Sequence, residues 1–349
     1  MTDISQRKAD HLDLATSGDV GFKRTTTLFE CVRLVHDALP ELDFAEIDTS
    51  IELFGKRLRA PILIAAMTGG HERAERINRE LASIAEERGY AFGLGSQRAM
   101  HKDPKKGRSY QVRREAPGVL LFGNVGVVQA AKMTTAEVEG LAGAVGADAL
   151  CVHLNPAMEL VQAEGDRDFR SGLDTLGRLA SELSIPVIAK ETGCGISSDV
   201  AERLRKAGIE HVDVSGAGGT SWVAVETQRA PGERRGLGET FWEWGIPTAA
   251  SVALVSGQGF SSIFATGGIS SGLDIAKAIA LGASAGGIAR AVLQALEGGG
   301  RAAAVAHLER IETEIRMAML LVGARDLAGL GRARRIVTGE LAEWIRQAR

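Results

Sequence analysis

The sequence has few cysteines and no long apolar run, and each of these shortages excludes a class of protein. Its 349 residues include only three cysteines, Cys31, Cys151 and Cys194, which are odd in number and far apart. This excludes a disulfide framework and a zinc knuckle. No segment approaches the roughly 20 apolar residues of a membrane-spanning helix, and the first residues lack the apolar centre of a signal peptide. We therefore expect a soluble, cytoplasmic protein.

A strong charge of one sign is also missing. The formal net charge is −3 at pH 7, and 24% of the residues are charged. Such a balance gives no general attraction to nucleic acid or to a membrane surface. Hydrophobic residues make up 45% of the chain, which is enough for a large core. Neither nucleic acid nor a membrane is therefore an expected partner.

One pattern repeats from about residue 60 to about residue 295. A short apolar run is followed by a small or polar turn and then by a segment of helical periodicity. The apolar runs lie at 61–67, 90–95, 119–124, 149–154, 186–190, 211–215, 262–266 and 286–290. The helical segments between them include 75–88, 135–145, 173–183, 199–206 and 273–281. Strands that alternate with helices are typical of parallel βαβ units, and eight of them predict an α/β protein with a (β/α)8 TIM barrel.

Two parts of the chain do not follow this pattern. Residues 1–59 are expected to form an N-terminal arm, with a helix at 28–39 and a short hairpin around Phe54-Gly55. Residues 60–349 then form the barrel, with helices from about residue 302 covering it. Inside the barrel, residues 216–245 are expected to form a long loop containing glycine, arginine and tryptophan. A long loop in a compact domain is usually either functional or disordered.

The ends of the predicted strands carry polar or glycine-rich residues. Active sites of such barrels lie at the carboxyl ends of the strands. Two glycine-rich turns, at Gly267-Gly268 and before Ala289-Arg290, each open a helix and are suited to bind a phosphate through backbone N–H groups. Because the chain has no G-x-G-x-x-G dinucleotide fingerprint, a phosphate-anchored cofactor is expected to be FMN. Lys190 would then lie near the flavin ring and stabilise its reduced, anionic form.

Six motifs make the chain resemble the type 2 isopentenyl-diphosphate isomerases. They are RKADH at 7–11, AAMTGG at 65–70, GSQR at 95–98, HLNP at 153–156, VDVSGAGGTSW at 212–222 and TGGISSGLDIAKAIALGA at 266–283. The resemblance covers nearly the whole chain. It implies a barrel that needs FMN and Mg²⁺ and is active when NADPH reduces the flavin. It also implies interconversion of isopentenyl and dimethylallyl diphosphate, and assembly as a homotetramer or homo-octamer.

The resemblance also implies roles for individual residues. The implied FMN contacts are Ala66, Met67, Thr68, Ser96, Asn124, Lys190, Ser215, Thr220, Gly267, Gly268, Ala289 and Arg290. The implied substrate contacts are Arg7, Lys8, His11, Ser96, Gln97, Arg98, His153 and Asn155. Glu159 is the implied magnesium ligand, and the catalytic positions are His153, Met158, Gln162 and Lys190. Arginine and lysine suit a diphosphate because they offer paired donors and a point charge, respectively.

The segment after the fourth predicted strand connects several of these residues. Asn155 and Pro156 are expected to start a helix, with Asn155 as its N-cap. Asn155, Glu159 and Gln162 would then share one helix face that points into the barrel mouth. His153 is expected to donate a hydrogen bond to the substrate phosphates.

Met158 departs from the family pattern, which usually has glutamine there. A thioether has no transferable proton. Gln162, or a water held by His153 and Glu159, could replace the amide. Two alternatives stay open: an FMN-dependent oxidoreductase of the 2-hydroxy-acid oxidase type, and a low-activity binder of FMN or a prenyl diphosphate. The first lacks its expected histidine and arginine motif, and the second is favoured only by Met158.

Overall fold

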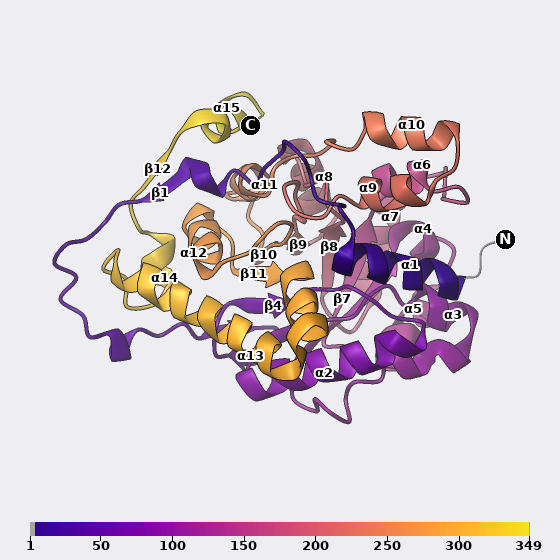
Figure 1. Cartoon of the computed structure of the whole chain (residues 1–349), viewed down its shortest axis with the longest axis horizontal. Helices are drawn as coiled ribbons and strands as arrows, with labels where there is room; N and C mark the ends of the chain where they lie inside the picture. The colour runs from indigo at the N-terminus through magenta and orange to yellow at the C-terminus, as the bar shows by residue number, and fades with distance from the viewer. Residues whose placement is uncertain (1–3, 349) are drawn as a thin grey trace.

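Eight parallel strands close into a barrel, and helices surround it (Figure 1). The computed structural model describes residues 4–348, except for the side chains of residues 4–7, 9 and 17. The barrel strands are β4 (Ile62–Ile64), β5 (Ala91–Gly93), β6 (Leu120–Gly126), β7 (Ala149–Leu154), β8 (Val187–Glu191), β9 (His211–Asp213), β10 (Ser262–Ala265) and β11 (Ala285–Ile288). Each overlaps one predicted apolar run, so the predicted TIM barrel is confirmed.

The helices of the barrel also follow the predicted pattern. They are α2 (Glu72–Arg88), α4 (Val127–Ala130), α5 (Thr135–Gly143), α7 (Gly172–Glu182), α8 (Ser198–Lys206), α11 (Thr248–Val255), α12 (Gly272–Leu281) and α13 (Arg290–Leu320). Local signals set their ends. The side chain of Ser271 accepts the Asp274 N–H at the start of α12, and Gly282 ends that helix in the left-handed conformation with φ 116°.

The amino end of the barrel is closed by a hairpin of β2 (Ile51–Leu53) and β3 (Lys56–Leu58). Phe54 and Gly55 have φ values of 50° and 74°, as a two-residue hairpin turn requires, so the predicted hairpin is confirmed. The Phe54 ring packs edge-on against Phe122 at 5.6 Å and stacks on Phe264 at 6.2 Å. The hairpin therefore plugs the amino end with apolar side chains, and ligands have access only from the carboxyl end.

The predicted helix at 28–39 is wrong. This segment forms a short 3-10 helix, η1 (Phe29–Cys31), and the strand β1 (Val32–Leu34). β1 pairs in antiparallel register with β12 (Arg335–Val337), which lies near the other end of the chain. The pairing partner of β1 is about 300 residues away, and a local periodicity cannot reveal it. Two short 3-10 helices, η2 (Phe44–Glu46) and η3 (Pro104–Tyr110), and the helices α14 (Leu327–Gly331) and α15 (Gly339–Gln347) complete the periphery.

Residues 216–245 do not form a long loop as expected. They contain α9 (Trp222–Arg229) and α10 (Glu233–Thr240). Ser221 starts α9 by accepting the Ala224 N–H. The first helix, α1 (Ile4–Ser17), lies beside α9 and over the barrel end, and it was not predicted either (Figure 1). The remaining helices, α3 (Arg98–Lys102) and α6 (Pro156–Val161), follow β5 and β7. Within residues 4–348, no helix combines the length and the apolar character needed to cross a membrane.

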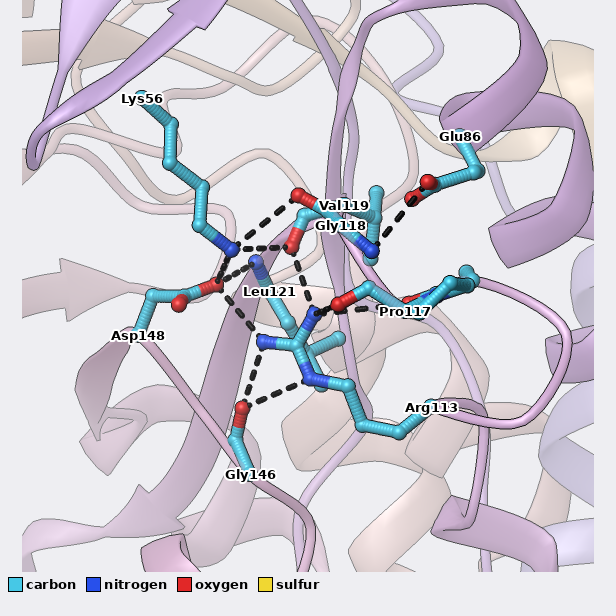
Figure 2. Close-up of polar contacts among 10 residues, drawn as sticks. Lys56, Glu86, Arg113, Pro117, Gly118, Val119, Leu121, Gly146 and Asp148 are labelled. Carbon is cyan, nitrogen blue, oxygen red and sulfur yellow. Dashed lines mark hydrogen bonds and ion pairs between the residues drawn. The ribbon is translucent and has the colours of Figure 1, made fainter.

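A polar network holds the hairpin to the barrel (Figure 2). Lys56 donates to the Asp148 carboxylate at 2.8 Å and to the carbonyl of Val119 at 2.9 Å. Asp148 also accepts the Leu121 N–H and the Arg113 guanidinium, each at 2.8 Å. Burial by itself raises the pKa of Asp148, but these donors outweigh it and hold the pKa below its ordinary value. One carboxylate therefore joins the hairpin, the loop before β6 and the loop before β7.

We predict that Asp148→Ala lowers the free energy of unfolding by about 2 kcal/mol, since three donors lose their acceptor at a partly exposed site. Because the folded pKa lies below 3.8, this contribution is present above about pH 5 and is lost as pH falls through the folded pKa. Urea unfolding at several pH values measures it. Asp168→Ala is the control, because the Asp168–Arg170 pair is 60% and 88% exposed. Equal losses in both variants would contradict this role of the network.

Candidate active site at the carboxyl end of the barrel

A cavity of about 580 Å³ lies over the carboxyl ends of the barrel strands. That is the usual size for a cofactor or substrate site. The structure places these predicted site residues in its wall: Lys8, His11, Ala66, Met67, Thr68, Ser96, Arg98, Asn124, His153, Asn155, Met158, Glu159, Gln162, Lys190, Ser215, Thr220, Gly267, Gly268, Ala289 and Arg290. Segments far apart in the sequence thus supply one continuous surface, although this placement does not by itself assign their roles.

One predicted residue in the described part of the structure, Gln97, does not line this wall. The side chain of Arg7 lies outside the described part of the structure. Gln97 is fully buried, and its Nε2 donates to the Leu141 carbonyl at 2.8 Å. Its Oε1 accepts the Asn124 N–H at 2.9 Å. The prediction that Gln97 contacts substrate is therefore corrected: both ends of its amide are bonded to the backbone, and it fixes the loop between β5 and α3.

A buried ion pair lies at the floor of the cavity. Lys190 on β8 places its Nζ 2.6 Å from Oδ2 of Asp213, the residue paired with it in register on β9. Thr266 donates to the other carboxylate oxygen of Asp213 at 2.6 Å. The two charged side chains are only 11% and 3% exposed. Burying either charge alone is costly, so each requires the other. Asp213 was not predicted as a site residue, although its position in the VDVS segment, at the end of a strand, was a signal.

His153 is held in one protonation state and one tautomer. Its Nδ1–H donates to Oδ1 of Asn124 at 2.7 Å. Burial, together with the positive charges of Lys190, Arg98 and Lys8, lowers the pKa of His153 to about 4. The ring is therefore neutral, and Nε2 carries a lone pair. In this state His153 can accept a hydrogen bond at Nε2, and its expected role as a donor to phosphate, which would require a proton on Nε2, stays a prediction.

Glu159 is fixed by two donors. Its Oε1 accepts the side-chain amide of Asn155 at 3.0 Å, and its Oε2 accepts the Asp166 N–H at 2.8 Å. Asn155 stands at the N-cap position, with Pro156 next, as predicted, but its side chain makes no cap hydrogen bond and turns to Glu159 instead. No group of three His, Cys, Asp or Glu side chains in the described chain is arranged to hold a metal ion. A Mg²⁺ ion at Glu159 would take its other ligands from water and substrate, as this ion commonly does.

Two buried donors on the cavity wall have no hydrogen-bond partner within the described residues. They are Nε of Arg98 and Nε2 of Gln162. Gln162 is the C-cap of α6 and does not continue its face, contrary to the expectation of one helical stripe. Nearly all buried polar groups in proteins are bonded, so two unpaired donors on residues that line one cavity favour an oxygen-rich ligand there. Asp166, which the sequence analysis missed, is the counter-charge 3.8 Å from Nη1 of Arg98.

The N-terminal helix reaches the cavity of its own barrel. Lys8 donates to the Ser96 carbonyl at 2.8 Å and to the Tyr110 hydroxyl at 2.7 Å. His11 donates from Nε2 to Glu226 of α9 at 2.6 Å. Tyr110 and Glu226 were not predicted as site residues, because the sequence does not show which segments the arm meets.

A helix N-terminus faces the cavity next to the two glycine turns. α13 starts at Arg290, and no side chain caps it at Ala289. Gly267 and Gly268 have φ values of 96° and 72°, a conformation that favours glycine. The Arg290 side chain donates to the carbonyls of Ala15 and Gly18 in the arm. Its guanidinium thus holds the arm down, and the backbone N–H groups of the first turn of α13 remain the predicted phosphate site of this segment.

We predict that His153 stays neutral, with a protonated Nδ1, from about pH 8 down to about pH 5.5 in the folded protein. Its folded pKa of about 4 lies below the ordinary 6.5, so the unfolded chain takes up the proton first as pH falls. The neutral His153 therefore lowers the free energy of unfolding progressively as pH falls from about 6.5 to about 4. Imidazole ¹⁵N NMR of the protein, with His153→Gln for assignment, measures this. A His153 signal that titrates near pH 6.5 would contradict it.

Comparison with known proteins gives the family. The family described as FMN-dependent dehydrogenase matches residues 2–104 and 152–337. An isopentenyl-diphosphate delta-isomerase of Methanothermobacter thermautotrophicus is 44% identical over 345 residues, which cover 99% of this chain and 96% of that protein. The protein of the same name from Methanosarcina barkeri is 45% identical over 349 residues, which cover 98% of this chain and 94% of the relative.

The solved structures agree on the fold. A mandelate oxidase variant with an FMN adduct superposes with a TM-score of 0.65 and 21% identity, covering 93% of this chain and 95% of its own. At that identity the likeness shows the fold alone. The similarity to the isomerases, by contrast, extends over nearly the full length of both chains. The chain therefore belongs to the isopentenyl-diphosphate delta-isomerases and to the broader family of FMN-dependent dehydrogenases.

Proposed function

We propose that this enzyme interconverts isopentenyl diphosphate and dimethylallyl diphosphate, with reduced FMN and Mg²⁺ bound and NADPH as the reductant. The observation that carries the proposal is the pair of unpaired donors, Arg98 Nε and Gln162 Nε2, close to the fixed carboxylate of Glu159. A diphosphate supplies oxygen atoms for such donors, and a magnesium ion joins its oxygens to a carboxylate. The name of the full-length relatives supports the same substrate.

The residues at the cavity floor fit FMN. The uncapped first turn of α13 and the turn at Gly267-Gly268 offer backbone N–H groups for its single phosphate. Lys190 offers a positive charge that Asp213 keeps in place. Thr68, Ser96, Ser215 and Thr220 offer hydroxyl groups along the wall. When bound and reduced, FMN supplies an acid/base site at its ring nitrogen N5.

The chain's own residues position the substrate and manage protons. Lys8 and Arg98 bring positive charge to the diphosphate, and Glu159 would hold the magnesium ion. His153 is neutral and presents an acceptor nitrogen in the wall. The arm, through Lys8 and His11, covers the cavity and limits the access of water. A double-bond shift requires that one proton is added to the substrate and another is removed from it. These residues must therefore leave a route by which a proton can leave the substrate.

Assembly as a homotetramer or homo-octamer is part of the proposal. Its support is a set of exposed apolar side chains on α6, α10 and the turn after α10: Leu160, Leu237, Phe241 and Trp244. The Phe241 and Trp244 rings contact each other at 5.7 Å. Exposed aromatic groups of this kind are typical of association surfaces. Light scattering after size-exclusion chromatography measures the assembly.

The deciding experiment follows isopentenyl diphosphate by NMR in D₂O with anaerobically reduced protein. We expect dimethylallyl diphosphate and deuterium incorporation only with reduced FMN and Mg²⁺ present, and released cofactor that mass spectrometry identifies as FMN. Lactate and mandelate serve as test substrates for the 2-hydroxy-acid oxidase alternative. Bound FAD, or flavin reduction by these acids without isomerisation, would contradict the proposal. Flavin binding with no turnover of any substrate would leave only the binder alternative.

We predict that Glu159→Gln raises the Mg²⁺ concentration needed for half-maximal rate by about tenfold or more, because the ion loses its one charged protein ligand. The matched control is Glu164→Gln, an exposed carboxylate in the loop after α6. Magnesium titrations of the NMR rate measure both variants. An unchanged titration for Glu159→Gln would place the metal elsewhere.

We predict that Met158→Gln increases kcat with little change in KM, since a positioned side chain that moves a proton is worth about 10²- to 10⁴-fold and acts in the transition state. The wild-type enzyme is then slow but active. Initial rates over a range of substrate concentrations measure this. A neutral or harmful Met158→Gln, with brisk wild-type turnover, would show that the proton path does not need an amide here.

A further inference from the structure

Glu191 is a buried acid that none of the roles above uses. It is the last residue of β8 and follows Lys190, so the two side chains point to opposite faces of the strand. Its carboxylate accepts the backbone N–H groups of Thr192 and Cys194. The side chain is only 7% exposed. Burying a carboxylate costs free energy, so a glutamate at this buried position indicates a role for its side chain.

The protonation of Glu191 is poised near neutral pH. Burial raises its pKa to about 7, although the two N–H donors and the Lys190 charge each pull it down. Lys190 and the Cys194 thiol are the charged or titratable groups that face it, and burial raises the pKa of that thiol so that it stays neutral. A group with this balance can both take up and release a proton at working pH.

A small side cavity connects Glu191 to the site. It offers about 10 Å³ to the centre of a water molecule, which is at the lower limit for one ordered water. Its wall includes Glu191, Asn155, Met158, Thr192 and Trp222. Four of these five residues, all except Glu191, also line the main cavity. Asn155, Met158, Thr192 and Trp222 are thus shared by the two cavities, and Glu191 lines the side cavity alone.

We propose that Glu191 is the proton acceptor for the isomerisation and acts through one water molecule held in this side cavity beside Met158. The inference rests on the proposed function and deepens it. Glu191 does not touch the substrate, and so it is a positioning and relay residue. The residues that line this small space include three polar ones that could hold a water, Asn155, Thr192 and Glu191.

The proton balance of the step is as follows. In the direction of dimethylallyl diphosphate, a donor in the main cavity gives a proton to C4. The C3–C4 double bond breaks, its electron pair forms the new C4–H bond and C3 becomes electron-deficient, and the donor later regains a proton from solvent. The C2–H bond then breaks, its electron pair forms the C2–C3 double bond, and the proton passes to the water. The water gives one of its own protons to the Glu191 carboxylate, which releases it to solvent before the next turnover. The reaction therefore needs no further oxidant or reductant in this step.

The first test is the pH profile of kcat for wild type and Glu191→Gln, both with FMN and Mg²⁺. Because the relay needs the carboxylate form, wild-type kcat should fall as pH drops below about 7, and Glu191→Gln should be slower by on the order of 10²-fold and lack this acid limb. KM should change little. The amide can still accept the two N–H bonds, so a merely structural role predicts a normal profile. Glu312→Gln is the control, since Glu312 is a 7% exposed glutamate bonded to Arg59 and Tyr90 away from the cavity.

A double-mutant cycle and a spectroscopic measurement separate the outcomes. If Met158→Gln provides a second route for the proton, Glu191→Gln should lower kcat by a smaller factor in the Met158→Gln variant than in wild type. The pH-difference infrared spectrum should show a protonated carboxyl band that titrates near pH 7 and is missing in Glu191→Gln, whether or not the enzyme turns over. An active wild type whose acid limb survives Glu191→Gln, or a missing band, would overturn the relay. A wild type that does not convert isopentenyl diphosphate overturns the proposed function itself.

Discussion

The buried pair of Lys190 and Asp213 is the interaction on which the rest of the site depends. Two adjacent parallel strands place the ammonium and the carboxylate in register, 2.6 Å apart, at the carboxyl end of the barrel. Neither charge can be kept without the other at this depth. The positive charge of Lys190 then acts on its surroundings: after burial, it contributes to the lowered pKa of His153 and opposes the raised pKa of Glu191. The charge of one ion pair thus adds to the effect of burial on His153 of β7 and opposes it on Glu191 of β8.

The arm is the second constraint, because it joins the site to parts of the chain that are distant in sequence. Arg290, at the start of α13, binds the carbonyls at the end of α1, and Glu226 of α9 binds His11. Binding a phosphate at the first turn of α13 would therefore occur within one residue of the anchor that holds the arm. The proposed phosphate site and the contacts of the arm therefore share this point of the structure.

The barrel could be predicted from the sequence, because its signal is local: short apolar runs alternate with helical segments, and each run became one strand. Features that depend on distant partners could not be predicted. β1 pairs with β12, so the helix at 28–39 was wrong. Gln97 belongs to the GSQR motif, but its side chain hydrogen-bonds to the backbone of α5 and does not line the cavity. The direction of a side chain and the partner of a buried charge, such as Asp213, require the three-dimensional structure.

The side chain at position 158 affects which hydrogen bonds its neighbours form. Asn155 Nδ2 lies 3.9 Å from the Met158 sulfur and 3.0 Å from Oε1 of Glu159. A thioether is a weak acceptor, so the Asn155 amide is left to the carboxylate. An amide side chain at position 158 would compete for Asn155 and would bring its own donor and acceptor to the boundary between the two cavities. With methionine there, the polar groups at this boundary are Asn155 and Thr192 on one side and Glu191 behind them. A proton path across this boundary would therefore use the groups around Met158, since the thioether itself carries no transferable proton.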